Sequence, residues 1–155
     1  VPDYRVIAAG LGILIVLIYA IGSGYWVDNS GWYQSLNRPR WQPPSFIFGI
    51  IWPYNFVMLG IASVTVANNL SRFKSLSFLF IFALSVISAL LWSYFFYQPH
   101  DFTKASAALI TTALLTIPLL ILTFQASRTI GLLLIPYQLW VTIASLLSVS
   151  YGKLN

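Results

Sequence analysis

Five long apolar runs, separated by short polar segments, dominate the pattern of hydrophobic and polar positions along the chain. The runs cover residues 6–26, 46–67, 76–97, 102–124 and 130–150. A helix needs about 20 mostly apolar residues to cross a hydrocarbon core of roughly 30 Å, and each run reaches this length. Backbone groups in lipid must be satisfied within a helix or a closed barrel, and the runs lack the alternation of barrel strands. The pattern therefore predicts an all-α fold, an integral membrane bundle of five transmembrane helices that forms a single domain over residues 1–155.

The composition agrees with a chain whose main solvent is lipid. Hydrophobic residues make up 59% of the sequence and charged residues 7%, and the mean hydropathy is +0.82. Ordinary soluble domains carry about 25% charged residues. Lysine and arginine outnumber acids 8 to 3 without forming a basic stripe, so we expect the lipid bilayer, and no nucleic acid, as a partner.

The basic residues do not decide the orientation, because each side of the predicted bundle carries four. They are Arg5, Arg72, Lys74 and Arg128 on the amino-terminal side, and Arg38, Arg40, Lys104 and Lys153 on the other.

The connection between the first two runs, residues 27–45, is the longest polar segment and interleaves aromatic residues with prolines. Proline stiffens the backbone, and Trp and Tyr favour the membrane interface, so one interpretation is simple anchoring at the membrane surface. The other is a lid that folds over the mouth of the bundle and presents Tyr33 and Trp41 to a ligand. Composition alone does not separate the two.

Four blocks of aromatic and proline residues follow one another in a fixed order. The first matches the pattern W-Y-x-x-L-x-K-P-x-W-x-P-P, with Arg38 in place of the lysine, and comprises Trp32-Tyr33, Leu36, Pro39, Trp41 and Pro43-Pro44. The second resembles W-x-x-x-Y-x-x-M-G and comprises Trp52, Phe56, Leu59 and Gly60. Residues 92–97 resemble W-[ST]-x-L-F-F, and residues 136–144, with Leu147 and the closing Leu154-Asn155, resemble P-Y-x-x-W-V-x-F-A-x-x-L-N and its tail. In these blocks the chain resembles the TspO/MBR family of tryptophan-rich sensory and translocator proteins.

The resemblance implies a five-helix bundle, commonly a homodimer, with a pocket at one end that the first loop closes. Members of the family bind porphyrins and other tetrapyrroles, with cholesterol a ligand in animals. We therefore expect a flat hydrophobic ligand, a porphyrin such as protoporphyrin or heme or a sterol-like molecule, and no required cofactor.

Helix geometry is consistent with such a pocket. Trp140, Ala144 and Ser148 recur every four residues and share one helix face, as do Trp52, Phe56 and Gly60. An aromatic residue followed by small ones can form a slot for a planar ligand, or can allow close helix packing; the resemblance favours the slot. We expect the ligand to contact Ser23, Tyr33, Trp41, Pro43, Trp52, Phe56, Trp92, Trp140 and Ala144.

Two positions depart from the family pattern. Relatives often carry Asn three residues before the tryptophan of the third helix, where this chain has Ala89, and Asn in the fifth helix, where it has Ser148. Both changes make the predicted pocket less polar, so we expect the ligand preference to differ from that of relatives.

The chemistry-bearing residues are few and scattered. There is no cysteine, the single histidine is His100, and the three acids are Asp3, Asp28 and Asp101, all in loops or near helix ends. We expect Asp101 to cap the fourth helix. No paired titratable groups suggest hydrolytic or acid/base catalysis, and no ionisable residue lies mid-membrane to couple transport. A ligand-binding receptor or sensor is therefore predicted, with passive transport of the ligand or light- or oxygen-dependent porphyrin degradation as alternatives.

Small residues recur at four-residue spacing on two predicted helices. Ser85, Ala89 and Ser93 form one ladder, and Ala20 and Gly24 a shorter one. Either could form the seam of a homodimer or serve packing within the chain. A bacterial cytoplasmic membrane is the expected location, with an organellar membrane as the alternative.

Overall fold

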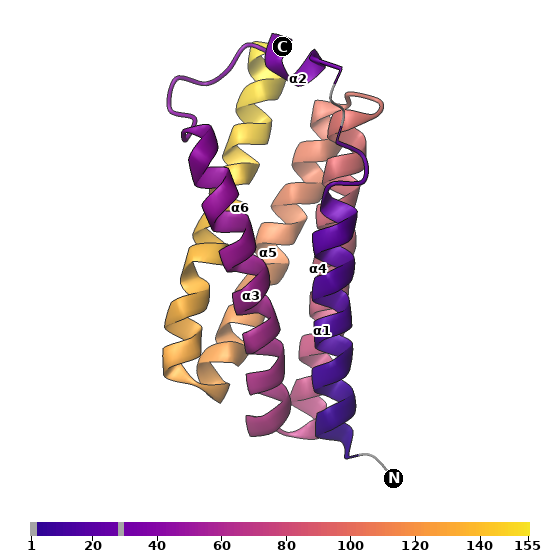
Figure 1. Ribbon diagram of the computed structural model, residues 1–155, viewed down its shortest axis with the longest axis vertical. Coiled ribbons are helices and arrows are strands. Elements are labelled where there is room, and N and C mark those ends of the chain that lie inside the picture. Colours follow the sequence, from indigo (N-terminus) through magenta and orange to yellow (C-terminus); the bar gives the residue numbers. More distant parts are fainter. Residues whose placement is uncertain (1–2, 28–29) are drawn as a thin grey trace.

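Helices form almost the whole of the computed structural model, which describes residues 3–27 and 30–155 (Figure 1). Five of them are long enough and apolar enough to cross a membrane, which confirms the predicted five-helix membrane bundle. They are α1 (Tyr4–Ser23), α3 (Ser45–Asn69), α4 (Arg72–Tyr97), α5 (Phe102–Ala126) and α6 (Arg128–Leu154), and a short helix α2 (Trp32–Ser35) lies between the first two. Asp28 lies outside the described residues.

The helix boundaries differ from the apolar runs by a few residues. α1 ends at Ser23, three residues before the run does, whereas α3 and α6 continue past their runs. Polar side chains mark the residues at which three of the helices begin. The carboxylate of Asp101 accepts a hydrogen bond from the Lys104 amide at 3.0 Å and caps α5, as predicted. Ser71 and Ser127 cap α4 and α6 in the same way.

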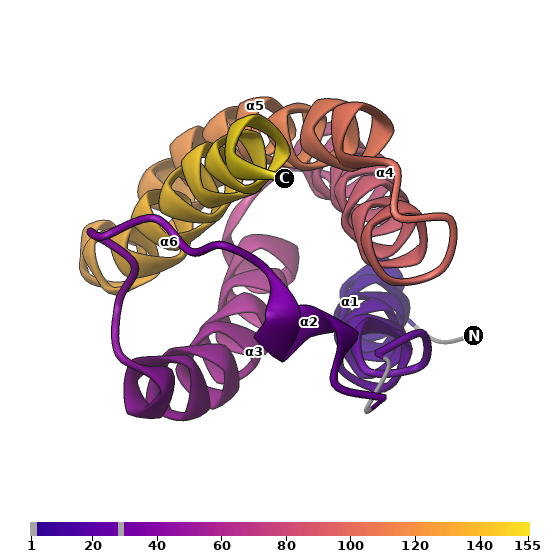
Figure 2. The same cartoon turned by 90° about the horizontal axis from the view of Figure 1, so that it is seen from above.

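The five long helices pack in a ring rather than in chain order. α4 packs against α5, and α5 against α6; α1 contacts α3 and α4, and α3 also contacts α6. Figure 2, a view down the bundle, shows α1 and α3 on one side and α4, α5 and α6 around the other. The shared core contains Leu59, Phe82, Leu119 and Leu134, all fully buried.

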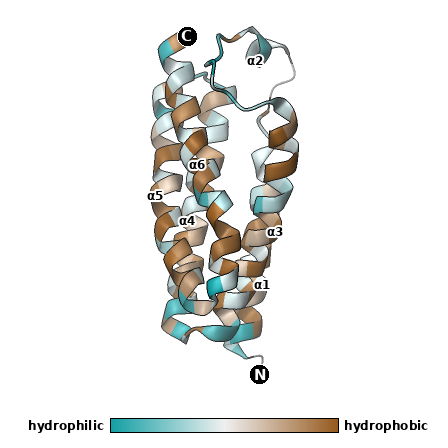
Figure 3. Cartoon of the chain, turned by 90° about the vertical axis from the view of Figure 1, so that its left-hand side faces the viewer, coloured by the Kyte–Doolittle hydropathy of each residue, from teal (hydrophilic) through white to brown (hydrophobic). Residues whose placement is uncertain are grey.

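Hydrophobic residues predominate along the middle of the helices, and hydrophilic residues are more frequent at the ends of the bundle (Figure 3). Leu17, Leu114 and Leu146 are each more than half exposed, as lipid-facing residues are. α1 begins at one end of the bundle and α6 finishes at the other, so an odd number of spans separates the two ends (Figure 1). The protein is an integral, multi-pass membrane protein.

The longer ladder of small residues faces inward. Ser85, Ala89 and Ser93 are all buried within the chain, and the Ser93 hydroxyl donates a hydrogen bond to the Ser23 carbonyl at 3.3 Å. This ladder therefore lets α1 and α4 approach closely. Gly24 of the shorter ladder is exposed. The homodimer stays a prediction.

Candidate functional site

A cavity of about 650 Å³ opens between the helices at the end of the bundle where α6 finishes. Its walls come from all five long helices, and its cover comes from the connection between α1 and α3, of which we call residues 30–44 the lid segment. Figure 2 shows this segment, with α2 in it, crossing the end of the bundle. Binding pockets for small molecules commonly measure about 300–1,000 Å³, so the cavity can hold one.

One wall of the cavity is a set of aromatic rings on α3. Trp52 and Phe56 are one helical turn apart and stack with their ring centroids 5.6 Å apart. Tyr19 of α1 meets both rings edge-on, at 6.1 Å from Trp52 and 5.2 Å from Phe56. Trp140 of α6 stands perpendicular to Trp52 at 6.3 Å. The result is a rigid corner of flat surfaces against which a planar apolar ligand can stack.

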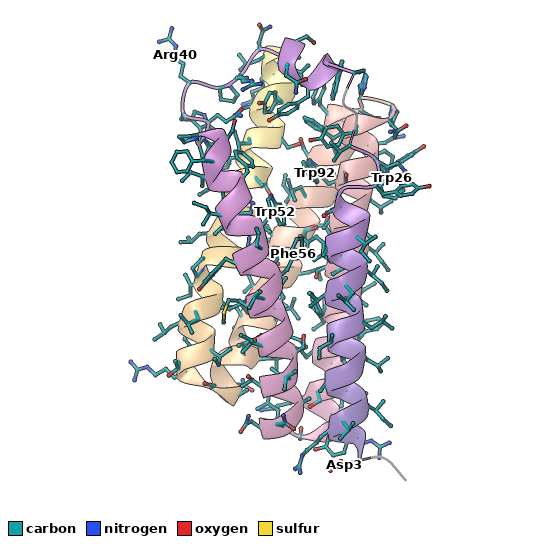
Figure 4. The ribbon with its side chains drawn as sticks, in the orientation of Figure 1. Asp3, Trp26, Arg40, Trp52, Phe56 and Trp92 are labelled. Atoms are coloured by element: carbon teal, nitrogen blue, oxygen red, sulfur yellow. The ribbon has the colours of Figure 1, made fainter. Side chains whose placement is uncertain are left out.

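The opposite wall is built on α4. Trp92 and Phe96 have their ring centroids 5.8 Å apart, and Figure 4 shows Trp92 across the bundle from Trp52 and Phe56. Ala89 and Ala144 also line the cavity, and their small side chains leave the space between the aromatic walls open.

Two polar groups on these walls lack partners. The indole N–H groups of Trp92 and Trp140 are buried and donate to no described residue. A buried donor without an acceptor costs about 1–3 kcal/mol. An acceptor group on a ligand would remove that cost, so the cavity can offer a ligand hydrogen bonds as well as aromatic surface.

A polar cluster lies where the lid segment meets α6. The Tyr151 hydroxyl donates a short hydrogen bond to Oε1 of Gln42 and lies 3.2 Å from the Tyr33 hydroxyl, and the side-chain amide nitrogen of Gln42 lies 3.5 Å from that Tyr33 hydroxyl. The Arg38 guanidinium lies 5.4 Å from the centre of the Tyr33 ring. The rim of the cavity is therefore polar and the depth apolar.

The lid segment is fastened at its start and at its middle. Gly31 adopts φ +93°, a left-handed conformation that glycine allows, and α2 starts directly after it. The Trp32 ring then stacks on His100 at 3.6 Å, in the connection between α4 and α5. Further along, the backbone N–H of Asn37 donates to Oδ1 of Asn155 at 3.0 Å, and Nδ2 of Asn155 donates to the backbone carbonyl of Asn37 at 3.1 Å.

Most of the residues predicted to contact a ligand come together around this cavity. Those that line it are Ser23, Tyr33, Trp52, Phe56, Trp92, Trp140 and Ala144. Trp41 and Pro43 do not line it, and the Trp41 side chain is 50% exposed. The lid interpretation therefore fits Tyr33, whereas the position of Trp41 fits an interfacial anchor. Contact of the lining residues with a ligand stays a prediction.

Several lining residues escaped the sequence analysis. Tyr19 lies one turn before Ser23 on α1, and Phe48 one turn before Trp52 on α3, so the four-residue spacing could have found both. Tyr151 lies two turns after Ala144 on α6, so the same spacing could have found it, whereas Gln42 lies in the lid segment and carries no such pattern. Ser148 lines the cavity too, but its hydroxyl lies 2.9 Å from that of Ser106 and is hydrogen-bonded to it.

The described residues provide no metal site. Histidine and the acids do not gather in any group of three among residues 3–27 and 30–155. Oδ2 of Asp101 lies 3.8 Å from Nζ of Lys104 in an ion pair, and neither residue lines the cavity. The arrangement offers stacking surface and hydrogen-bond donors, and it places no carboxylate in the described lining.

Comparison with known proteins gives one consistent result. The sequence pattern of the TspO/MBR family matches residues 11–154. The chain is 32% identical over 124 residues to the tryptophan-rich protein TspO of Bacillus cereus, and the match covers 80% of each chain. It is 30% identical over 152 residues to the uncharacterized membrane protein YtaB of Bacillus subtilis, covering 96% of this chain and 97% of that one. The tryptophan-rich sensory protein of Cereibacter sphaeroides is 27% identical over 124 residues, covering 80% and 77%.

Proposed function

The chain belongs to the TspO/MBR family, and we propose from this premise that it is a membrane receptor or sensor that binds a porphyrin or a similar flat hydrophobic ligand in the cavity under the lid segment. The observation that carries the proposal is the aromatic corner of Tyr19, Trp52, Phe56 and Trp140 beside an open space of about 650 Å³. Flat rings stack well on such surfaces, and the apolar depth excludes water from a hydrophobic ligand.

The sensory role rests on the relatives. One of them is named a tryptophan-rich sensory protein, and five of the matched proteins are bacterial. We accordingly propose a bacterial cytoplasmic membrane as the location. The absence of an acid or base in the described lining supports binding over acid/base catalysis.

The test fills the cavity without removing any wall. Ala144→Phe adds a ring to the space between the aromatic walls, and Leu146→Phe adds a ring on the same helix where the side chain is 56% exposed to lipid. Purified protein in neutral detergent is titrated with protoporphyrin, and binding is measured from the Soret band of the porphyrin. This readout does not depend on the tryptophans of the protein.

We expect saturable binding by the wild type and by Leu146→Phe, and affinity about 5- to 150-fold weaker for Ala144→Phe, because overpacking the site costs about 1–3 kcal/mol. Absence of saturable binding by the wild type would overturn the proposal. Equal affinities of the two variants would place the porphyrin elsewhere on the protein.

A further inference from the structure

Among the described residues that line the cavity, Arg38 is the one with a charged side chain. The other described lining residues are apolar, aromatic or uncharged polar residues. Arg38 belongs to the lid segment, is exposed and lies at the rim, so the described lining combines an apolar depth with a cation at its mouth. An arginine remains charged at every physiological pH, and its planar guanidinium matches the geometry of a carboxylate.

The chain holds Arg38 in place on both sides. Asn37 is fixed by the two hydrogen bonds between its backbone and the Asn155 side chain. A third hydrogen bond runs from its side-chain nitrogen to the Leu154 carbonyl at 3.2 Å. Pro39, which follows Arg38, is buried and has a restricted backbone. The guanidinium then lies over the Tyr33 ring, 5.4 Å from its centre. A cation held in this way loses less conformational freedom on pairing with a ligand than a freely moving one does.

No described residue supplies the anion that this cation would pair with. Across residues 3–27 and 30–155 the structure contains one ion pair, Lys104 with Asp101, and neither residue lines the cavity. Beside Arg38, the Tyr33 hydroxyl and the side-chain amide nitrogen of Gln42 add groups that can donate hydrogen bonds to a carboxylate. The described part of the rim therefore has the donors of a carboxylate site and no carboxylate.

We propose that Arg38 is the residue that recognises the acid group of a ligand in this cavity: the flat apolar body of the ligand stacks between the tryptophans, and its carboxylate pairs with Arg38 at the rim. The inference rests on the proposed function, because it assigns a recognition residue to the ligand of the same cavity. It makes Arg38 a residue that determines specificity, and it selects porphyrins that carry free acid groups over neutral ones.

Another source of anions is the lipid headgroup, and Arg40 provides the control for it. Arg40 lies two residues along the same lid segment, is exposed, does not line the cavity and points away from the bundle (Figure 4). A cation that only anchors the lid segment to lipid phosphate would behave as Arg40 does.

The experiment compares protoporphyrin with its dimethyl ester, which has the same ring and no acid groups. The affinity of each porphyrin is measured for the wild type, Arg38→Gln, Arg38→Lys and Arg40→Gln in neutral detergent. Each porphyrin is compared with itself across the variants, so its partition into the micelle cancels. The ester also reports folding, because a misfolded variant would lose it as well.

We expect Arg38→Gln to weaken protoporphyrin binding about tenfold, as loss of a charge-assisted hydrogen bond does, and to change ester binding by less than about twofold. Arg38→Lys should recover part of the loss, because it keeps the charge without the planar fork. Arg40→Gln should bind both porphyrins as the wild type does.

The outcomes separate this inference from the proposed function. Equal effects of Arg38→Gln on acid and ester, or no effect on either, would overturn the carboxylate site while leaving porphyrin binding intact. A loss with Arg40→Gln equal to that with Arg38→Gln would assign the effect to general surface charge and overturn it too. Failure of the wild type to bind either porphyrin would refute the proposed function itself.

Discussion

Gly12 lies at a close approach of α1 to α3, and replacing it tests whether this contact sets the geometry of the bundle. A Cβ atom at position 12 would lie 2.4 Å from Cβ of Ser63 on α3 and 2.9 Å from its hydroxyl oxygen. Gly10, two residues earlier on α1, has no atom within 4 Å of the corresponding position and is exposed. Gly12→Ala and Gly10→Ala therefore make the same chemical change in two different surroundings.

The expected difference in stability between the two variants depends on whether the atoms around position 12 can move aside. Cβ of Ser63 is fixed to the α3 backbone, the side chain is buried, and its hydroxyl donates to the Leu59 carbonyl at 2.8 Å, so α3 itself must shift to admit the methyl group. Overpacking of this kind costs about 1–3 kcal/mol. The gain in helix propensity from glycine to alanine, roughly 1 kcal/mol, is common to both variants and cancels in their difference. Gly12→Ala should thus be less stable than Gly10→Ala by about 1–3 kcal/mol.

The free energy of unfolding can be measured by titrating the purified protein from dodecyl maltoside into sodium dodecyl sulfate and following the loss of helix by circular dichroism. The reasoning is refuted if the two variants unfold within about 0.5 kcal/mol of each other, the ordinary range for surface changes. Gly12 shares a helix face with Tyr19, which lines the cavity, so Gly12→Ala should also weaken porphyrin binding relative to Gly10→Ala.

Three further changes probe contacts elsewhere in the chain. Asp101→Ala should lower the free energy of unfolding by about 1 kcal/mol in the same titration because it removes the cap of α5, and Asp101→Asn, which can still cap, should match the wild type. Tyr137→Phe should cost about 1–3 kcal/mol because it removes the partner of the buried Tyr19 hydroxyl, 3.0 Å away, and adding Tyr19→Phe should recover part of this loss rather than deepen it. Asn155→Ala should speed amide hydrogen exchange in residues 30–44 about tenfold, since Asn37 loses both of its bonds to that side chain; unchanged exchange would contradict the fastening of the lid segment.

The membrane spans and the cap at Asp101 could be predicted because both depend on residues close together in sequence. Hydropathy over about 20 residues defines a span, and a cap needs only an acceptor three residues before an amide. The faces of the helices were predictable for the same reason. The spacing of four between Trp52 and Phe56, and between Trp140 and Ala144, places each pair on one face, and the structure turns both faces toward the cavity.

The path of the lid segment could not be predicted, because it depends on contacts between residues far apart in sequence. Asn37 and Asn155 are separated by 118 positions, and so are Tyr33 and Tyr151. No periodic pattern links such pairs. Aromatic composition alone therefore gave Tyr33 and Trp41 the same role, whereas the structure puts the first in the cavity wall and leaves the second half exposed.

The departures from the family pattern also take a different meaning once the cavity is known. Ala89 does line the cavity, and the Ser148 hydroxyl is engaged with Ser106, so neither position offers the polar group that relatives place there. The donors in the described lining include the indole groups of Trp92 and Trp140, which are buried and unpaired in the walls, and the cation at the rim. A hydrogen bond to a ligand is worth most where its loss leaves a buried group unpaired, and a charge at the mouth acts on ligands that carry the opposite charge. Selectivity in this chain should therefore depend less on a side-chain amide inside the bundle, and more on where a ligand places its acceptor atoms along the tryptophans and its acid group at the lid segment.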